Sequence, residues 1–396
     1  MATGVPSRKR RVDSPYELVY DSKMPTEEVL ELPPVEPLAI DINGTSVQGQ
    51  LFKGDNLGAM LWLMRDHAVR GKVQCVYIDP PYSTSMAFVD REVRHAYDDV
   101  LLGAQYIEFL RRRLIVLREL MADDGTIFVH LDQKMIFEAK VIMDEVFGRK
   151  NFRNFITRRK CSTKNYTRHT FGNVSDHILL YSKSESYTWH RPYDQWTKDR
   201  LAEEYPYVDA ATGKRYKRVP VHAPGVRNGA TGKLWRGKLP PPGKHWQFTP
   251  AKLDQLDAAG EIYWSATGNP RRKVFYDANK GIPAQDIWLD SKDPHNQNTL
   301  ITGYPTEKNF DMLCRIVEAT TNPGDLVLDC FAGSGTTLEA ATLLGRRFIG
   351  IDNSDAAIES TVNRLRNGRK RMGDFVSRKK RGGANPSLGI LFDHGH

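Results

Sequence analysis

The residues best suited to chemistry form one short run, Asp79-Pro80-Pro81-Tyr82, directly after an apolar stretch over 73–78. Two prolines stiffen this turn and remove two amide donors, so the Asp79 carboxylate and nearby carbonyl groups face a hydrogen-bond donor. Tyr82 adds a flat aromatic face. An exocyclic amine on a planar base would satisfy these groups, because it donates two hydrogen bonds while its ring stacks on the tyrosine. The alternative interpretation is a rigid turn with a core tyrosine.

A glycine-rich turn is the second candidate site. It lies between an apolar strand predicted over 326–330 and a helix predicted over 335–344. Glycines there let a ligand approach the backbone closely, and the start of a helix leaves amide groups free. Asp352 ends the next predicted strand, where a carboxylate is placed to accept hydrogen bonds from ribose hydroxyls.

Three ligands compete for this turn. A phosphate-binding loop would need Gly-Lys-Ser/Thr, and the stretch has no lysine. A dinucleotide fingerprint would need a third small residue where Leu338 stands. S-adenosylmethionine is the third candidate, and the Asp-Pro-Pro-Tyr run favours it.

Strand and helix signals alternate at both ends of the chain. Strands are predicted over 50–53, 73–78, 126–131, 326–330 and 347–351. Helices are predicted over 57–64, 106–121, 134–147, 310–319, 335–344 and 355–365, with a turn at 123–125. This alternation predicts an α/β fold with a doubly wound, mostly parallel sheet. The stretch from about 185 to 300 lacks the rhythm, which indicates an inserted domain.

Positive charge is concentrated in part of the chain. The sequence has 57 Lys and Arg against 48 Asp and Glu, a net charge of +9. The window 149–250 alone holds 21 basic and 7 acidic residues, interleaved with tyrosines and tryptophans. Such a segment suits a polyanion with stackable bases, although a solvated surface is the alternative. The basic residues expected to contact DNA are Arg158, Arg159, Lys160, Lys164, Arg168, Lys214, Arg215, Lys217 and Arg218.

Composition excludes several classes of protein. Hydrophobic residues at 40% and charged residues at 27% argue against a disordered chain, and no apolar run reaches the ~18–20 residues of a membrane span. The four cysteines are far apart and the eleven histidines form no cluster, so neither a disulfide framework nor a metal site is predicted. These features predict an intracellular protein.

The two motifs together resemble those of the amino-group DNA methyltransferases, the adenine-N6 and cytosine-N4 enzymes. The resemblance covers about 48–182 and 301–367, and the Asp-Pro-Pro-Tyr run precedes the glycine turn. That order is similar to the beta group of the family, which includes type III modification subunits and orphan adenine methylases. The resemblance implies a circularly permuted methyltransferase fold with an inserted target-recognition domain. It also implies double-stranded DNA as substrate, with a second copy of the chain or a separate restriction subunit as candidate partners. From it we expect a cytoplasmic protein of prokaryotic or phage type, associated with DNA.

The resemblance also assigns residues. Asp79, Pro80, Pro81 and Tyr82 would bind and activate the flipped target base. The segment 302–308 is similar to the family's Thr-x-Lys-Pro-x-x-Leu pattern, with Tyr304 where lysine is common. S-adenosylmethionine would be held by Asp55, Thr306, Asp329, Phe331, Ala332, Gly333, Ser334, Gly335, Thr336 and Asp352.

We predict a tail over 1–40, the first part of the methyltransferase fold over 41–184 and the insert over 185–300. The second part of the fold covers 301–367, and a basic tail covers 368–396. An aspartate in the first position of the tetrad favours adenine-N6 methylation, since cytosine-N4 enzymes usually carry serine. Cytosine-N4 methylation, methylation of RNA or of a protein glutamine, and an inactive DNA-binding homologue remain alternatives.

Overall fold

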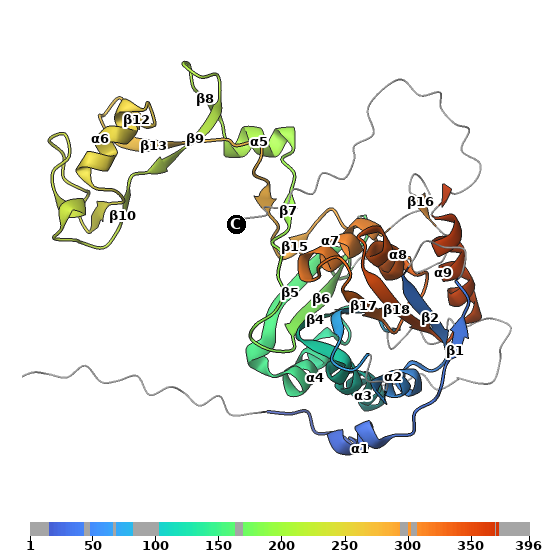
Figure 1. The fold of residues 1–396 in the computed structure, drawn as a ribbon. Helices are drawn as coiled ribbons and strands as arrows, with labels where there is room; N and C mark the ends of the chain where they lie inside the picture. The colour runs from blue at the N-terminus through green and yellow to red at the C-terminus, as the bar shows by residue number, and fades with distance from the viewer. Residues whose placement is uncertain are drawn as a thin grey trace, which may run out of the picture. The chain divides into compact units, whose positions relative to one another are not determined.

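The computed structural model describes residues 16–42, 48–65, 69–81, 103–162, 169–293, 300–301, 307–368 and 370–371. Its contacts divide it into two units (Figure 1). The core unit contains the chain up to residue 192 and again from residue 285, and the inserted unit is Tyr193–Ala284. The inserted unit is shorter than the predicted 185–300 because both flanking segments pack within the core unit. For example, the His190 amide donates to the Ala319 carbonyl at 2.7 Å.

A nine-stranded sheet forms the core unit, in the order β1-β2-β18-β17-β3-β4-β6-β5-β15. Its central strands all pair in parallel: β2 (Gly49–Lys53), β18 (Arg347–Asp352), β17 (Leu326–Asp329), β3 (Val73–Ile78) and β4 (Met121–Leu131). The outer strands are β1 (Leu38–Ile40), β6 (Ser175–Ser182), β5 (Phe152–Arg159) and β15 (Ile287–Trp288). β1 and β6 run antiparallel to their neighbours, so the sheet is mostly parallel, as predicted.

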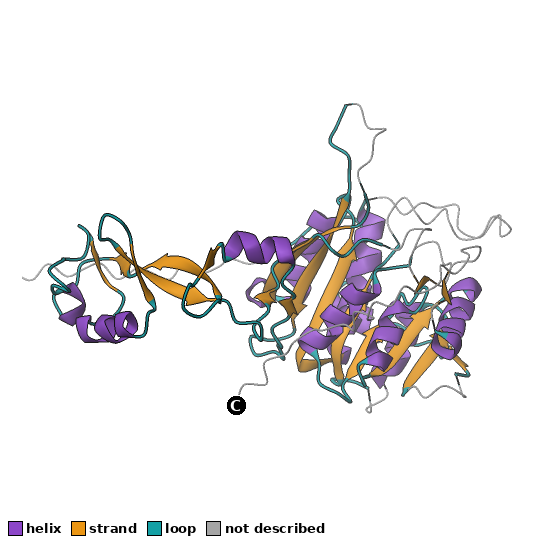
Figure 2. Cartoon of the chain, turned by 90° about the horizontal axis from the view of Figure 1, so that it is seen from above, coloured by secondary structure: helices purple, strands orange, loops and turns teal. Residues whose placement is uncertain are grey.

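Helices cover both faces of this sheet (Figure 2). One face is covered by α2 (Asn56–Arg65), α3 (Ala104–Leu120) and α4 (Ile136–Phe147). The other face is covered by α7 (Phe310–Thr320), α8 (Thr336–Leu343) and α9 (Asp355–Asn367). β3 is buried on both sides: Val76 and Ile78 pack toward the first set of helices, and Cys75 and Tyr77 toward the second. This burial explains the continuous apolar run in the sequence of β3.

The predicted turn at 123–125 is instead part of β4. α3 ends at Leu120 and β4 begins at Met121, and the pairing of β3 with β4 is irregular between Val73 and Cys75. A Cβ added to Gly125 would lie 2.9 Å from the Val73 carbonyl oxygen. The backbones therefore approach closely here, which explains the glycine at this irregularity.

The described part of the predicted N-terminal tail, from residue 16 onward, is packed on the core unit. It contains α1 (Thr26–Glu31) and β1. The Tyr20 hydroxyl donates to Glu108 at 2.6 Å, and the Lys23 ammonium lies 2.9 Å from Glu145. The prediction of a tail over 1–40 is therefore wrong for these residues, because the charged side chains of α3 and α4 find partners in this segment.

The inserted unit has a small sheet and a core of its own. The sheet runs in the order β12-β13-β9-β8 and is antiparallel throughout. Its strands are β8 (Tyr207–Val208), β9 (Arg215–Pro220), β12 (Ile262–Trp264) and β13 (Pro270–Phe275). The other elements are β7 (Tyr193–Asp194), α5 (Lys198–Glu204), β10 (His222–Pro224), β11 (Lys244–Trp246), α6 (Pro250–Ala258) and β14 (Ile282–Pro283). Trp235, Trp246 and Leu253 are at the centre of the core.

A short strand pair, β16 (Leu300–Ile301) with β19 (Lys370–Arg371), completes the described sheets. No helix in the described part of the chain is long and apolar enough to cross a membrane.

Truncating Arg111 tests the packing of the N-terminal segment. Arg111 is buried, and it donates to Glu145 at 2.9 Å and to the Met24 carbonyl at 2.8 Å. We expect Arg111→Ala to lower the free energy of unfolding by about 3–5 kcal/mol, because buried carboxylates lose their partner. Urea denaturation measures this loss. Arg70→Ala is the control: its side chain is 53% exposed and pairs with Glu119, so a loss below about 1 kcal/mol is expected. Equal effects of the two substitutions would contradict the packing.

Candidate active site

The candidate site lies at the carboxyl ends of the parallel strands. Asp79 follows β3, Asp329 ends β17 and Asp352 ends β18, and these three strands are neighbours in the sheet. The helix that follows β17 covers one face of the sheet, whereas α3, which follows β3, covers the other. Connections that diverge in this way leave a crevice at the carboxyl edge, where α/β proteins bind ligands. The two sequence motifs, far apart in the chain, therefore meet at one edge.

Two of the three aspartates predicted to hold the donor also build the glycine turn. Asp329 accepts hydrogen bonds from the Phe331 amide at 3.0 Å and the Thr337 hydroxyl at 2.6 Å. Asp352 accepts from the Gly333 amide at 2.8 Å and the Ser354 amide at 3.0 Å. Each carboxylate oxygen can accept a second hydrogen bond, so these contacts leave capacity for a ligand.

The glycines of this turn are required by the backbone. Gly335 has φ +72° and immediately precedes α8. A Cβ at Gly335 would lie 2.8 Å from Thr361, whose hydroxyl donates to the Gly333 carbonyl at 3.0 Å. Larger residues are therefore excluded by conformation and by space.

Asp55 reaches the site through contacts that the sequence did not reveal. Its carboxylate lies 3.2 Å from the Arg113 guanidinium, and its side chain is 58% exposed. Arg113 also donates to Asn56 at 2.6 Å, and Asn56 donates to the Cys330 carbonyl at 2.7 Å. Burial lowers the pKa of Arg113 to about 10. Arg113 lies within a run of three arginines on the helix α3, and nothing in that run marks it as the buried link to the glycine turn.

The Asp79 carboxylate has a cationic partner that sequence reasoning missed. The Lys308 ammonium lies 2.8 Å from Asp79 Oδ2, and both side chains are largely buried. Lys308 is held in place by its neighbour Glu307, which pairs with the buried Arg364. Shifted by four residues, the Thr-x-Lys-Pro-x-x-Leu pattern matches Thr306 and Lys308, with Asn309 in place of the proline. In this register the lysine of the pattern falls at 308 and not at Tyr304.

Behind Asp79 lies a buried polar chain. His130 Nδ1 is 3.9 Å from Asp79 Oδ1 and 2.7 Å from the Tyr77 hydroxyl. On its other side, His130 Nε2 is 3.1 Å from Asp176. Burial lowers the pKa of His130, so its ring is neutral near pH 7. A neutral ring satisfies both nitrogens in either tautomer. Nε2 can donate to Asp176 while Nδ1 accepts the Tyr77 hydroxyl proton, or Nε2 can accept from the Arg158 guanidinium at 3.1 Å while Nδ1 donates to the Tyr77 oxygen.

Arg158 is the last member of this row of buried polar side chains, and it does not face DNA. Its side chain is fully buried, and its guanidinium donates to Asp176 at 2.6 Å and to Asp293 at 2.8 Å. These carboxylates hold the pKa of Arg158 above its ordinary value. The prediction that Arg158 contacts DNA is wrong, because its charge is neutralised inside the core unit.

The other predicted residues have different outcomes. Tyr82, Thr306, Lys164 and Arg168 lie outside the described residues. Arg159 and Lys160, at the end of β5, are partly exposed. Phe331, Ala332, Ser334 and Thr336 all belong to the turn after β17, and their contact with a donor stays a prediction. Within the described residues, no group of His, Cys, Asp and Glu could hold a metal ion.

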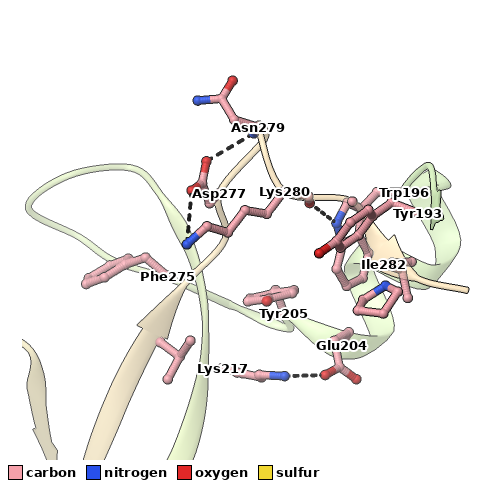
Figure 3. Close-up of a pocket in the computed structure, with 13 residues that line it drawn as sticks. Tyr193, Trp196, Glu204, Tyr205, Lys217, Phe275, Asp277, Asn279, Lys280 and Ile282 are labelled. Atoms are coloured by element: carbon pink, nitrogen blue, oxygen red, sulfur yellow. Dashed lines mark hydrogen bonds and ion pairs between the residues drawn. The ribbon is translucent and has the colours of Figure 1, made fainter. Parts of the chain in front are cut away.

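Some basic residues of the inserted unit line a pocket, and others lie outside it. A pocket of about 750 Å³ is lined by aromatic side chains that include Tyr193, Trp196 and Tyr205 (Figure 3). Polar groups that line the pocket have partners within the inserted unit. Lys217 pairs with Glu204, and the Trp196 indole donates to the Lys280 carbonyl at 2.9 Å. Of the other predicted DNA contacts, Lys214 is exposed and Arg215 donates to the Tyr205 carbonyl at 3.1 Å.

Two aspartates and a glycine turn at the carboxyl edge of a doubly wound sheet are typical of α/β enzymes that bind nucleosides. The chain belongs to the DNA methylase family, which matches residues 73–363. The predictions of the family, of its fold and of S-adenosylmethionine as its cofactor are thereby confirmed at the level of the family.

Several known proteins are similar to this chain. The type II methyltransferase M.EcaI of Enterobacter cloacae is 55% identical over 306 residues, which cover 77% of this chain and 67% of that protein. The Mod subunit of the type III restriction-modification enzyme StyLTI of Salmonella typhimurium is 27% identical over 332 residues. This match covers 74% of the chain but only 49% of the subunit. Among solved structures, the M1.HpyAVI–SAM complex aligns with a TM-score of 0.42 and 17% identity, over 80% of this chain and 99% of that one.

Replacing Asp329 tests the electrostatics of the turn. Burial raises the pKa of Asp329 from 3.8 to about 7. Because the folded-state pKa lies above that of the unfolded chain, the contribution of Asp329 to stability is greatest below pH 4 and declines as pH rises toward 7. Asp329→Asn removes this decline, and it keeps a side chain that can bond both partners. We therefore expect the stability of the variant, relative to the parent, to increase between pH 4 and pH 7.

Urea denaturation at several pH values measures this trend. Asp123→Asn is the control, because the Asp123 side chain is 96% exposed and its replacement should shift stability by a similar amount at each pH. A constant difference between Asp329→Asn and the parent across this range would contradict the assignment.

Proposed function

We propose that this protein transfers a methyl group from S-adenosylmethionine to the N6 amine of an adenine flipped out of double-stranded DNA. The observation that supports the proposal most strongly is the meeting of the Asp79 turn with the glycine turn across the neighbouring strands β3 and β17. A base amine bound at Asp79 and a donor bound at the glycine turn would then be adjacent. Proximity of two bound reactants supplies a large part of a catalytic effect.

The residues at this edge fit the donor. S-adenosylmethionine supplies a methyl group on a positively charged sulfur and also carries an ammonium and ribose hydroxyls. Acceptors for such a ligand are present in Asp55, Asp329 and Asp352. The Tyr106 hydroxyl is buried and has no hydrogen-bond partner in the described structure, and burial together with the nearby Asp79 charge raises its pKa. This hydroxyl is a donor available to a bound ligand.

Asp79 is the residue proposed to activate the amine. An exocyclic amine conjugated to its ring is a poor nucleophile. Hydrogen bonds from N6 to the Asp79 carboxylate and to the Pro80 carbonyl would pull the nitrogen toward sp³ geometry and free its lone pair. Lys308 positions the carboxylate from one side, and His130 lies behind it on the other. The carboxylate would thus present a fixed acceptor to a base that must leave the helix to reach it.

Adenine is favoured over cytosine by the aspartate that opens the tetrad. A cytosine-N4 enzyme of this type usually carries serine there. Methylation of cytosine N4 is therefore the alternative to be distinguished from methylation of adenine N6. The second alternative is a homologue that binds DNA but has lost methyltransferase activity. Against it, both motifs are intact in the sequence. Analysis of the methylated nucleosides after digestion of the product DNA distinguishes adenine from cytosine.

Partners follow from the same proposal. Double-stranded DNA is the substrate, and the enzyme works where the DNA is, in the cytoplasm. A relative is named a subunit of a restriction-modification enzyme, so a restriction subunit is one proposed partner and a second copy of this chain is the other. Light scattering of the purified protein, alone and with DNA, reports the oligomeric state.

Replacing Asp79 tests the proposal. We expect Asp79→Ala to slow methyl transfer by about a hundredfold or more, because the amine loses the acceptor on which its activation depends. Donor binding should be retained, since the contacts of the glycine turn do not involve Asp79. Single-turnover transfer with tritiated donor, calorimetric donor binding and a melting curve measure the three quantities.

Asp144→Ala is the matched control. Asp144, in α4, is also largely buried, and it accepts from the hydroxyl of Tyr181 in β6 at 2.6 Å. This variant should lose stability but transfer methyl groups at the parental rate below its melting temperature. Full transfer by a stably folded Asp79→Ala variant would rule out Asp79 as the activating residue.

A further inference from the structure

One face of the small sheet in the inserted unit is rich in tyrosine and in cationic residues. Side chains alternate along β9, so Tyr216 and Arg218 point to the same side of the sheet. The register places Lys273 opposite Arg218 and Arg271 opposite Pro220. The neighbouring strands add Tyr207, opposite Tyr216, and Tyr263, opposite Arg271. We call this side, with Tyr207, Tyr216, Arg218, Tyr263, Arg271 and Lys273, the tyrosine face.

Arg218 is clamped between two of these rings. Its guanidinium carbon lies 3.5 Å from the ring centroid of Tyr207 and 3.5 Å from that of Tyr263. A planar guanidinium stacks on aromatic rings, and each such contact contributes about 0.5–1 kcal/mol at an exposed site. The clamp fixes the plane of the side chain before any ligand arrives, which reduces the entropy lost on binding.

Among the described residues, no acidic side chain pairs with Arg218. Other cations of the inserted unit are paired: Lys273 lies 2.7 Å from Asp209, and Arg236 lies 3.3 Å from Asp254. For Arg218, the described residues supply only the Tyr216 hydroxyl, at 3.5 Å. Its Nε atom is buried without an acceptor. The two rings cover the faces of the guanidinium, so its donors can be reached only along the edge.

We propose that Arg218 reads a guanine in the DNA target of this enzyme, by donating two hydrogen bonds to O6 and N7 in the major groove. This inference rests on the proposed function. Guanine presents two acceptors in one plane on its major-groove edge, and a bidentate arginine is the commonest way to recognise it. A phosphate is the competing acceptor. It accepts donors from many directions, so it gains little from a guanidinium fixed in one plane. The clamp therefore favours the base.

The wild-type enzyme supplies the first test. Sequencing of DNA from cells that express the protein, by a method that reports modified bases, gives the recognised sequence. Each guanine of that sequence is then replaced in turn by 7-deazaguanine, which keeps base pairing but lacks the N7 acceptor. We expect single-turnover transfer to fall at least about tenfold at one guanine. A recognised sequence without guanine, or a rate insensitive to every replacement, would overturn the proposal.

Arg218→Lys then assigns the effect to this residue. Lysine keeps the charge but loses the fork and the stacking, so transfer to the natural duplex should fall by roughly tenfold or more. The same variant should show no further loss on the 7-deazaguanine duplex that slowed the parent. An Arg218→Lys enzyme that keeps the parent's sensitivity to that replacement would overturn the assignment.

Arg271→Lys is the matched control. Arg271 is exposed on the same face, on the adjacent strand, and it lacks the double ring contact. Its replacement should change transfer on natural and modified duplexes by the same factor. If Arg218→Lys instead lowers transfer equally on all duplexes, Arg218 contacts phosphate and the inference is wrong. If the parent methylates no DNA at all, the proposed function has failed, whatever the role of Arg218.

Discussion

The site depends on the parallel pairing of β17 between β3 and β18. Two strands from the C-terminal part of the chain, β17 and β18, thereby lie between β3 and β2 from the N-terminal part. The register matches Leu328 with Val76 on one side and with Ile349 on the other, so the three strands end within two residues of one another. A shift of one residue would turn every side chain to the opposite face, and buried apolar residues on both faces prevent it. The hydrophobic core thus fixes the separation of two turns that carry little apolar surface themselves.

Polar groups behind the site work by a different principle. Asp79 lies in front of His130, which lies against Asp176, and Arg158 connects Asp176 with Asp293. Asp176 and Arg158 are buried, and either charge would be costly alone. Removal of any one member would leave a neighbouring polar group without its partner. The hydrogen bonds therefore fix the positions of these side chains more strictly than apolar packing would. Asp293 belongs to the segment by which the chain returns from the inserted unit, and Arg158 thereby holds this returning segment against the catalytic strands.

Sequence patterns were informative wherever one face or one strand decides the outcome. Continuous apolar runs predicted β3 and β17, and a periodic stripe predicted α3, because burial alone determines these elements. Charge patterns failed where the outcome depends on distant partners. Arg158 stands in a basic run, yet its two carboxylates are 18 and 135 residues away in sequence. Lys308 was hidden by a second possible alignment of its motif, and α1 by the prolines and polar residues around it. Only the three-dimensional fold reveals these partners.

The inserted unit begins and ends with strands that pair with each other, Tyr193–Asp194 with Ile282–Pro283. Its two ends are therefore side by side, as in a module that can be exchanged for another of different length. Recombination at this strand pair could give a lineage a new recognition sequence. The strands that carry the candidate active site would keep their connections. Strain-to-strain variation would then be expected to concentrate between these two short strands, with abrupt boundaries at both.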